Sequence, residues 1–271
     1  MSSSLLMQPF AAPAEGIISL PGSKSQTNRA LLCAALSEGT SRLSGVLYAE
    51  DTEAMLEAIV SFGAVVEEDR QNFEIEVTGI AGAPVFQELA IDARQSGTTS
   101  RFLLPTLAAG NGRVTLDGDQ ELRARPFSEQ IDALRDLGCE IEELDKRGGL
   151  PVVVSARGVE RSEVEIAAAT SSQFVSGLLL AAPLYSNGLK INLTSPAISR
   201  PYIELTVEVM RDFGVLVEQP DDSTYVVNPG HYRAAEVHIE PDASAASYFF
   251  AAAAITHGRV RITGLHSESR Q

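Results

Sequence analysis

A short polar stretch near the start of the chain has the residue types of an anion-binding site. The segment from Leu20 to Arg29 reads LPGSKSQTNR, a turn followed by small polar residues, and leads into an apolar stretch that predicts a helix over residues 30–36. The first N–H groups of a helix have no intrahelical partner, and the helix macrodipole favours negative charge there. Lys24 and Arg29 add two cations. The stretch predicts a phosphate or carboxylate site, although a capped helix start beside a lysine is also common without a ligand.

Similar polar clusters precede three more apolar stretches. They read QSGTTSR from residue 95, TSSQ from residue 170 and DASAAS from residue 242. Arg29 and Arg101 are 72 residues apart, as are Arg101 and Gln173, and helix-ending pairs of an apolar residue and glycine recur at spacings of 75 and 76 residues. This regular spacing predicts an internal repeat. The repeat would bring several anion-binding helix starts into one protein.

Each repeat has the pattern of an apolar helix, a strand, an amphipathic helix and two further strands. The expected helices span residues 30–36, 52–62, 102–108, 128–137, 174–184, 202–213 and 246–255. The expected strands span residues 41–47, 64–68, 73–78, 113–116, 139–143, 152–155, 190–193, 215–218, 225–228 and 259–263. Pro105 falls inside one expected helix, where it should bend the helix or remove a backbone hydrogen bond.

Length and composition favour a large globular protein. With 271 residues, of which 44% are hydrophobic, the chain can bury a large core, and its length predicts two domains. There is no run of 18 apolar residues, and Met1 to Gln8 lack the pattern of a signal peptide, so we expect a cytoplasmic protein. Cys33 and Cys139 match no metal or redox spacing, which favours buried free thiols. The four histidines lie outside the polar clusters and are interpreted as surface or packing residues, with a general base as the alternative.

The net charge of the sequence argues against nucleic acid as a partner but leaves the binding of a small anion in a cleft open. A formal net charge of −15 is opposite to the basic surface that nucleic-acid binding requires. A cleft can still be positive, because the local distribution of charge sets its field. Seven of the 21 lysines and arginines lie in or beside the polar clusters: Lys24, Arg29, Arg94, Arg101, Arg123, Arg125 and Arg200.

Two of these arginines, Arg123 and Arg125, precede Pro126 in a loop between an expected strand and an expected helix. Arginines suit bidentate capture of a carboxylate or phosphate. The alternative is a loop arginine that pairs with Asp117 or Asp119, and spacing alone does not separate the two.

Six motifs together resemble those of the 5-enolpyruvylshikimate-3-phosphate synthases, also called 3-phosphoshikimate 1-carboxyvinyltransferases. They are PGSKSQTNRALL, SGTTSRF, RARPF, TSSQF, SRPYI and PDASAASYF, and they follow the order and spacing of that family from Leu20 to Phe250. The resemblance implies the α/β enolpyruvyl transferase fold, with two halves that are each an inside-out assembly of three βαβαββ repeats around buried parallel helices. It implies three complete repeats here and a truncated fourth. Residues 21–240 would form the first domain, whereas residues 1–20 and 241–271 would belong to the second.

The resemblance also implies a reaction, in which the enolpyruvyl group of phosphoenolpyruvate is transferred to the 5-hydroxyl of shikimate-3-phosphate and phosphate is released. This is a step of the shikimate pathway of aromatic amino-acid biosynthesis, without a metal ion or organic cofactor, and a full-length protein would be a monomer. The positions that match shikimate-3-phosphate-binding residues are Lys24, Ser25, Arg29, Ser171, Ser172, Ser199 and Tyr202. The positions that match phosphoenolpyruvate-binding residues are Lys24, Gly97, Arg125 and Gln173. Lys24 is also the catalytic position that the chain matches.

The sequence departs from the family pattern in several places. Gln95 stands where Asn is usual, Arg200 replaces a common Lys, and we expect a structural role for Arg101. The family's catalytic Asp after Ile-Pro, its Glu-x-x-Arg motif and a later Arg and Lys are not found before Gln271. The repeat length puts the missing part at roughly 150 to 190 residues. We therefore expect an incomplete chain that has no transfer activity alone.

Two other functions remain open at this point. A non-catalytic domain that binds a phosphorylated ligand would have the same helix starts, and turnover assays would distinguish it. UDP-N-acetylglucosamine enolpyruvyl transferase shares the fold, but its loop before Arg-Pro usually carries a reactive Cys, and residues 118–126 contain none. In the favoured interpretation, the resemblance implies that glyphosate occupies the phosphoenolpyruvate side of the cleft.

Overall fold

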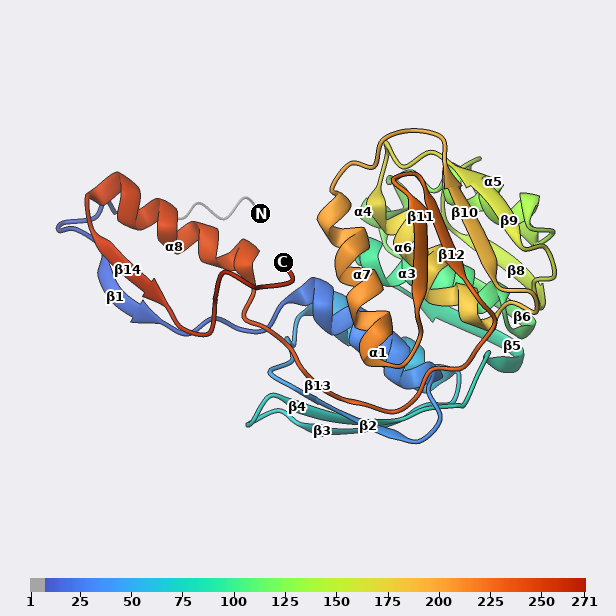
Figure 1. Cartoon of the computed structure of the whole chain (residues 1–271), viewed down its shortest axis with the longest axis horizontal. Helices are drawn as coiled ribbons and strands as arrows, with labels where there is room; N and C mark the ends of the chain where they lie inside the picture. The colour runs from blue at the N-terminus through green and yellow to red at the C-terminus, as the bar shows by residue number, and fades with distance from the viewer. Residues whose placement is uncertain (1–7) are drawn as a thin grey trace.

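Three four-stranded sheets with one topology make up most of the computed structural model, which describes residues 8–271 (Figure 1). The first sheet has the order β13 (Glu236–His238), β2 (Thr40–Ser44), β4 (Glu74–Thr78) and β3 (Val65–Asp69). The second has the order β5 (Val85–Asp92), β6 (Asn111–Asp117), β8 (Val152–Arg157) and β7 (Glu140–Glu143). The third has the order β9 (Glu163–Ile166), β10 (Leu189–Leu193), β12 (Thr224–Val227) and β11 (Val217–Asp221). In each sheet the first pair of strands is parallel and the other two pairs are antiparallel.

The first strand of each sheet is the element that the sequence patterns did not predict. β5, β9 and β13 are short or mostly exposed, so they lack a long hydrophobic alternation. β13 follows the third sheet in the chain but pairs in parallel with β2, from Glu236 opposite Arg42 to His238 opposite Ser44. A segment from the far end of the chain therefore completes the first sheet.

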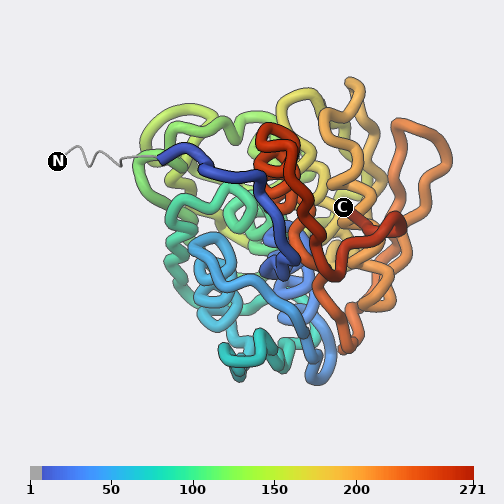
Figure 2. The backbone as a smooth tube through the Cα atoms, turned by 90° about the vertical axis from the view of Figure 1, so that its left-hand side faces the viewer, coloured from blue at the N-terminus to red at the C-terminus, as the bar shows by residue number. Residues whose placement is uncertain are grey.

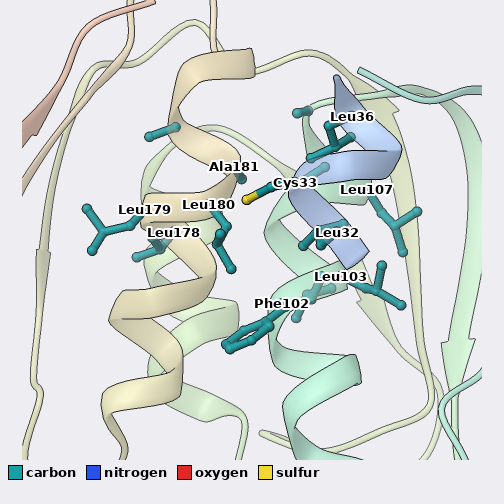
Figure 3. Close-up of a cluster of buried hydrophobic side chains, with 14 of the residues drawn as sticks. Leu32, Cys33, Leu36, Phe102, Leu103, Leu107, Leu178, Leu179, Leu180 and Ala181 are labelled. Carbon is teal, nitrogen blue, oxygen red and sulfur yellow. The ribbon is translucent and has the colours of Figure 1, made fainter. Parts of the chain in front are cut away.

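Three helices that are buried on nearly every side pack together inside the sheets. They are α1 (Lys24–Leu36), α3 (Gly97–Ala108) and α6 (Ser172–Ala181). Figure 3 shows side chains of all three, including Cys33, Phe102 and Leu180, in one cluster. A helix that is buried all round needs apolar residues on every face, which these sequences provide along most of their length. Cys33 is a buried free thiol, as expected, and Cys139 is a partly buried one.

The remaining helices of this body cover the core with one face. These helices are α2 (Glu50–Ser61), α4 (Gln120–Arg123), α5 (Ser128–Asp136) and α7 (Arg200–Asp212). A short 3-10 helix, η1 (Ala182–Leu184), follows α6. Every helix and strand expected from the sequence is present. The expected and observed bounds differ most at the starts of α1 and α3, because the polar residues before each apolar stretch form the first turns of these helices.

Pro105 lies inside α3 and removes a backbone hydrogen bond, as expected. Because proline has no N–H, the carbonyl oxygen of Arg101 one turn earlier receives no donor from position 105. The side-chain Nε2 of Gln130, in α5, donates to this oxygen at 2.8 Å. Gln130 is fully buried. A bond missing within one helix is thus replaced by a bond between two helices.

Two neighbouring segments connect this body to a smaller part, which lies at the left of Figure 1 and consists of β1 (Glu15–Ile18), α8 (Ala243–Thr256) and β14 (Arg259–Ile262). β1 pairs in parallel with β14. The N–H of Ser23 donates to the Glu240 carbonyl at 2.8 Å, and the N–H of Asp242 donates to the Pro21 carbonyl at 2.9 Å. The blue and red segments therefore run side by side in Figure 2.

The domain boundaries after residues 20 and 240 stay predictions. Residues 1–7 lie outside the described residues. The expectation that Met1 to Gln8 form no signal peptide falls almost entirely on these residues. Within residues 8–271, no helix is long and apolar enough to cross a membrane.

α8 is an apolar helix with little cover. Ala246 is its buried residue, whereas Tyr248 and Ile255 are 78% and 75% exposed. Phe250 is also exposed, while Phe249 is partly buried.

We predict that Gln130 and Pro105 are energetically coupled. Gln130→Leu leaves the Arg101 carbonyl buried without its donor, which costs about 1 to 3 kcal/mol. In a Pro105→Ala background the N–H of residue 105 can bond to that carbonyl, so the same change should cost at least about 0.5 kcal/mol less. Urea unfolding of the native chain, both single variants and the double variant measures this difference. Equal costs of Gln130→Leu in the two backgrounds would contradict the account.

Candidate functional site

The N-terminal ends of α1, α3, α6 and α7 meet at one cavity of about 400 Å³. Its lining comprises Lys24, Ser25, Arg29, Thr98, Thr170, Ser171, Ser172, Gln173, Ile198, Ser199 and Tyr202. All seven residues that the sequence assigns to shikimate-3-phosphate are among them. Gln173, assigned to phosphoenolpyruvate, lies there too. The sequence did not single out Thr98 or Ile198, which become visible only when the helices are placed together.

Three of these helix starts are capped but carry no acid. Ser23, Ser96 and Ser171 are the N-caps of α1, α3 and α6, and each side chain accepts a backbone N–H of the first turn. None of the three helices has an acidic residue in its first turn. By contrast, the first turn of α2 has three. Acidic residues in the first turn normally offset the positive end of the helix dipole, and these three helices supply none of their own. Two carboxylates from elsewhere in the chain lie nearby, Asp242 at the first N–H of α1 and Asp51 at the hydroxyl of Ser96.

Arg29 is a buried cation that connects three helices. Its side chain, which is 1% exposed, donates four hydrogen bonds. Nε donates to Thr206 Oγ1 (2.7 Å), Nη1 to the Ser25 carbonyl (2.7 Å), and Nη2 to Ser176 Oγ (3.3 Å) and the Tyr202 carbonyl (3.0 Å). Burial lowers the pKa of the guanidinium to about 9. Within residues 8–271 no carboxylate pairs with it, so its charge is compensated by neutral acceptors alone.

Lys24 lies where α1, α2 and the segment before α8 come together. Its Nζ is 3.3 Å from Oδ2 of Asp51, and Oδ1 of the same carboxylate accepts the hydroxyl of Ser96 at 2.8 Å. The backbone N–H of Lys24 donates to Asp242 Oδ2 at 3.2 Å. The Lys24 side chain is 44% exposed and lines the cavity, so its ammonium group can approach a ligand there while it pairs with Asp51.

Of the residues assigned to phosphoenolpyruvate, Gly97 lies at the start of α3, where Arg125 approaches it. A Cβ on Gly97 would be 2.8 Å from Nη1 of Arg125 and 3.7 Å from Nη1 of Arg101. Two guanidinium groups therefore approach the same glycine. Burial, and next the charge of Arg125, lowers the pKa of Arg101 to about 10. Arg101 donates to Gln173 Oε1 at 2.6 Å, which links this side to the main cavity.

The loop before Pro126 uses its two arginines differently. Arg123 pairs with Asp117, with Nε 2.9 Å from Oδ1, so the structural alternative is correct for this residue. Arg125 is exposed, and no ion pair to it is found in the described part of the chain. Arg125 is therefore the arginine available to an anion.

Two inferences from the sequence need correction. Arg94 pairs with Glu57, and Arg200 pairs with Glu204 and Asp222, so neither contributes an unpaired charge to the cavity. The equal spacing of Arg29, Arg101 and Gln173 also does not reflect equal positions. Arg29 and Arg101 are six and five residues after their N-caps, whereas Gln173 is two residues after its own.

The sheet topology and the buried helices are those of the enolpyruvyl transferase fold, with a cavity where four helix starts meet. The chain belongs to the family "EPSP synthase (3-phosphoshikimate 1-carboxyvinyltransferase)", whose model matches residues 11–271. The chain is 40% identical over 274 residues to the 3-phosphoshikimate 1-carboxyvinyltransferase of Erwinia tasmaniensis, covering 100% of this chain and 64% of the relative. It is 39% identical over 260 residues to that of a Sulfurovum species, covering 95% and 61%.

A solved structure agrees with this assignment. EPSP synthase from Acinetobacter baumannii superimposes with a TM-score of 0.78 at 27% identity, covering 92% of this chain and 55% of that chain. The chain thus spans less than two thirds of the length of these relatives.

Thr206 should contribute to stability through Arg29. Thr206→Val removes the acceptor of Nε and leaves a buried charged donor unpaired. Thr106→Val is the matched control, because Thr106 is equally buried but its hydroxyl bonds to the Phe102 carbonyl of its own helix at 3.0 Å. We expect Thr206→Val to cost at least about 1 kcal/mol more than Thr106→Val in urea unfolding. Similar costs would show that the bond to Arg29 adds nothing.

Proposed function

We propose that the chain binds shikimate-3-phosphate and phosphoenolpyruvate and serves the transfer of the enolpyruvyl group to the 5-hydroxyl of shikimate-3-phosphate, with release of phosphate. The observation that carries the proposal is the cavity where three acid-free helix starts and an uncompensated buried arginine meet. Membership of the family supports the identity of the two substrates. This chain matches only 64% of the length of the first relative. The transferase activity of the longer protein is therefore part of the proposal.

Shikimate-3-phosphate would occupy the main cavity. Ser25, Ser171 and Ser172 offer hydroxyls and first-turn N–H groups, which suit the oxygens of a phosphate. Ser199 and Tyr202, at the start of α7, also line the cavity and would contact the rest of the ligand.

Phosphoenolpyruvate would lie toward the start of α3. It carries a phosphate and a carboxylate, so it needs several donors, and Lys24, Arg125 and Gln173 supply them from three different helices or loops. A cation placed where negative charge develops also stabilises the transition state, which is the role that we propose for Lys24. Gly97 leaves room beside Arg125.

Lys24→Ala tests the shikimate-3-phosphate site. Losing a charge-assisted contact should weaken binding by roughly tenfold or more in titration calorimetry. Lys190→Ala is the matched control, since Lys190 is 45% exposed against 44% for Lys24 and also has one carboxylate partner, Glu163. Equal affinities of the two variants would remove Lys24 from the site. Arg29→Ala is a less direct test, because the loss of four buried hydrogen bonds would also affect folding.

Gly97→Ala tests the phosphoenolpyruvate side. The new Cβ would lie 2.8 Å from Nη1 of Arg125 and must displace it. We expect the affinity for phosphoenolpyruvate, measured with shikimate-3-phosphate present, to fall at least about fivefold, while shikimate-3-phosphate alone binds within about twofold of the native affinity. Gly230→Ala is the control, since its Cβ would meet only Asn228 O at 4.0 Å. Equal losses for both ligands would contradict the assignment of this side.

A further inference from the structure

The side-chain amide of Gln173 is held at both of its ends. Its Oε1 accepts from Nη1 of Arg101 at 2.6 Å, and its Nε2 donates to Thr98 Oγ1 at 3.0 Å. Gln173 and Thr98 both line the cavity. Of the two hydrogens on Nε2, the second is not used by Thr98, so the amide retains a donor for a ligand.

Arg101 determines which end of this amide can lie beside it. A guanidinium has five N–H donors and no acceptor, whereas an amide has an acceptor end and a donor end. If the amide of Gln173 were turned around, its N–H₂ group would face N–H donors of Arg101 and neither would be satisfied. The hydroxyl of Thr98 accepts or donates, so it imposes no such choice.

Arg101 is itself fixed by its surroundings. Its Nη2 donates to the Pro126 carbonyl at 3.1 Å, and its Cζ lies 4.9 Å from the ring centre of Phe174 and 5.2 Å from that of Phe127. The residue is 8% exposed. Its backbone carbonyl is bonded to Gln130 rather than to position 105. The side chain therefore has little freedom to move away from Gln173.

We propose that Arg101 is a positioning residue that fixes the amide of Gln173 with its N–H₂ group available to the cavity, and thereby sets the preference of this wall for anions. The inference rests on the proposed function for the identity of the anions. The orientation of the Gln173 amide does not depend on the proposed function. It assigns Arg101 a specific role beyond that of a general structural contact.

The orientation is tested first in the ligand-free chain. The Gln173 side-chain amide is assigned in a ¹⁵N NMR spectrum by its loss in Gln173→Glu. In Arg101→Leu its two hydrogen resonances should move toward the values of an exposed glutamine. Arg157→Leu is the control, because it removes the same charge from a site that is distant in the fold, where the Arg157 side chain is 82% exposed. Unmoved Gln173 resonances in a folded Arg101→Leu protein overturn the proposal.

Gln173→Glu supplies the second test and does not depend on whether Arg101→Leu folds. A carboxylate can accept from Arg101 and gives this buried cation a counter-charge, but it has no N–H for the ligand. We expect the melting temperature to rise and the affinity for phosphoenolpyruvate, measured by calorimetry with shikimate-3-phosphate present, to fall at least about tenfold. Unchanged affinity overturns the proposal.

The two tests also separate this inference from the proposed function. If the native chain binds neither ligand, the proposed function fails while the NMR comparison still decides the role of Arg101. If the native chain binds both ligands but the Gln173 amide resonances do not move in Arg101→Leu, the inference fails while the proposed function stands.

Discussion

The buried guanidinium of Arg29 is the constraint on which the arrangement of the helices depends. A cation removed from water is costly unless hydrogen bonds satisfy it. Here the acceptors come from α1 itself and from Ser176 in α6 and Thr206 in α7. The helices that supply them must therefore lie against α1, which brings their N-terminal ends to one place. The neutral acceptors satisfy the N–H groups but leave the charge uncompensated, and an anion in the adjoining cavity would compensate it.

The distribution of carboxylates explains how a chain with a net charge of −15 can bind anions. Away from the cavity, cations such as Arg70, Arg123 and Arg135 each pair with a carboxylate. At and beside the cavity, Lys24 pairs with Asp51, whereas the hydrogen-bond acceptors of Arg29 and Arg101 are neutral and both cations lie against aromatic rings. Charges outside the cavity are screened by solvent while buried ones are screened less, so the buried arginines weigh more at the cavity than the net charge does.

The sequence predicted most of the fold because its signals are local. Apolar stretches after polar clusters located α1, α3 and α6, although not the starts of α1 and α3, and glycine after each amphipathic helix located its end. The strands β5, β9 and β13 carry no such signal, since their identity depends on pairing with a strand elsewhere in the chain. For the cavity, the polar clusters identified residues such as Ser25 and Ser171, whereas the roles of Thr206 and Ser176 depend on a contact that spans long stretches of sequence. The sequence also could not show that, within residues 8–271, Arg200 pairs with acids while Arg125 does not.

The geometry of the proposed phosphoenolpyruvate side is tied to core packing through one face of α3. Gly97, Arg101 and Pro105 are spaced four residues apart and so lie along the same face of the helix. Gly97 has no side chain, which leaves room for Arg125. Pro105 has no N–H, which leaves the Arg101 carbonyl to accept from Gln130. A Cβ on Gly177 of α6 would lie 2.2 Å from that same carbonyl oxygen, so α6 approaches α3 closely at this level. Because Gln173 lies one turn earlier on α6, the distance between these two helices also sets the distance between Arg101 and the amide that it holds. The position of the Gln173 amide relative to Arg101 therefore follows from the packing of two core helices.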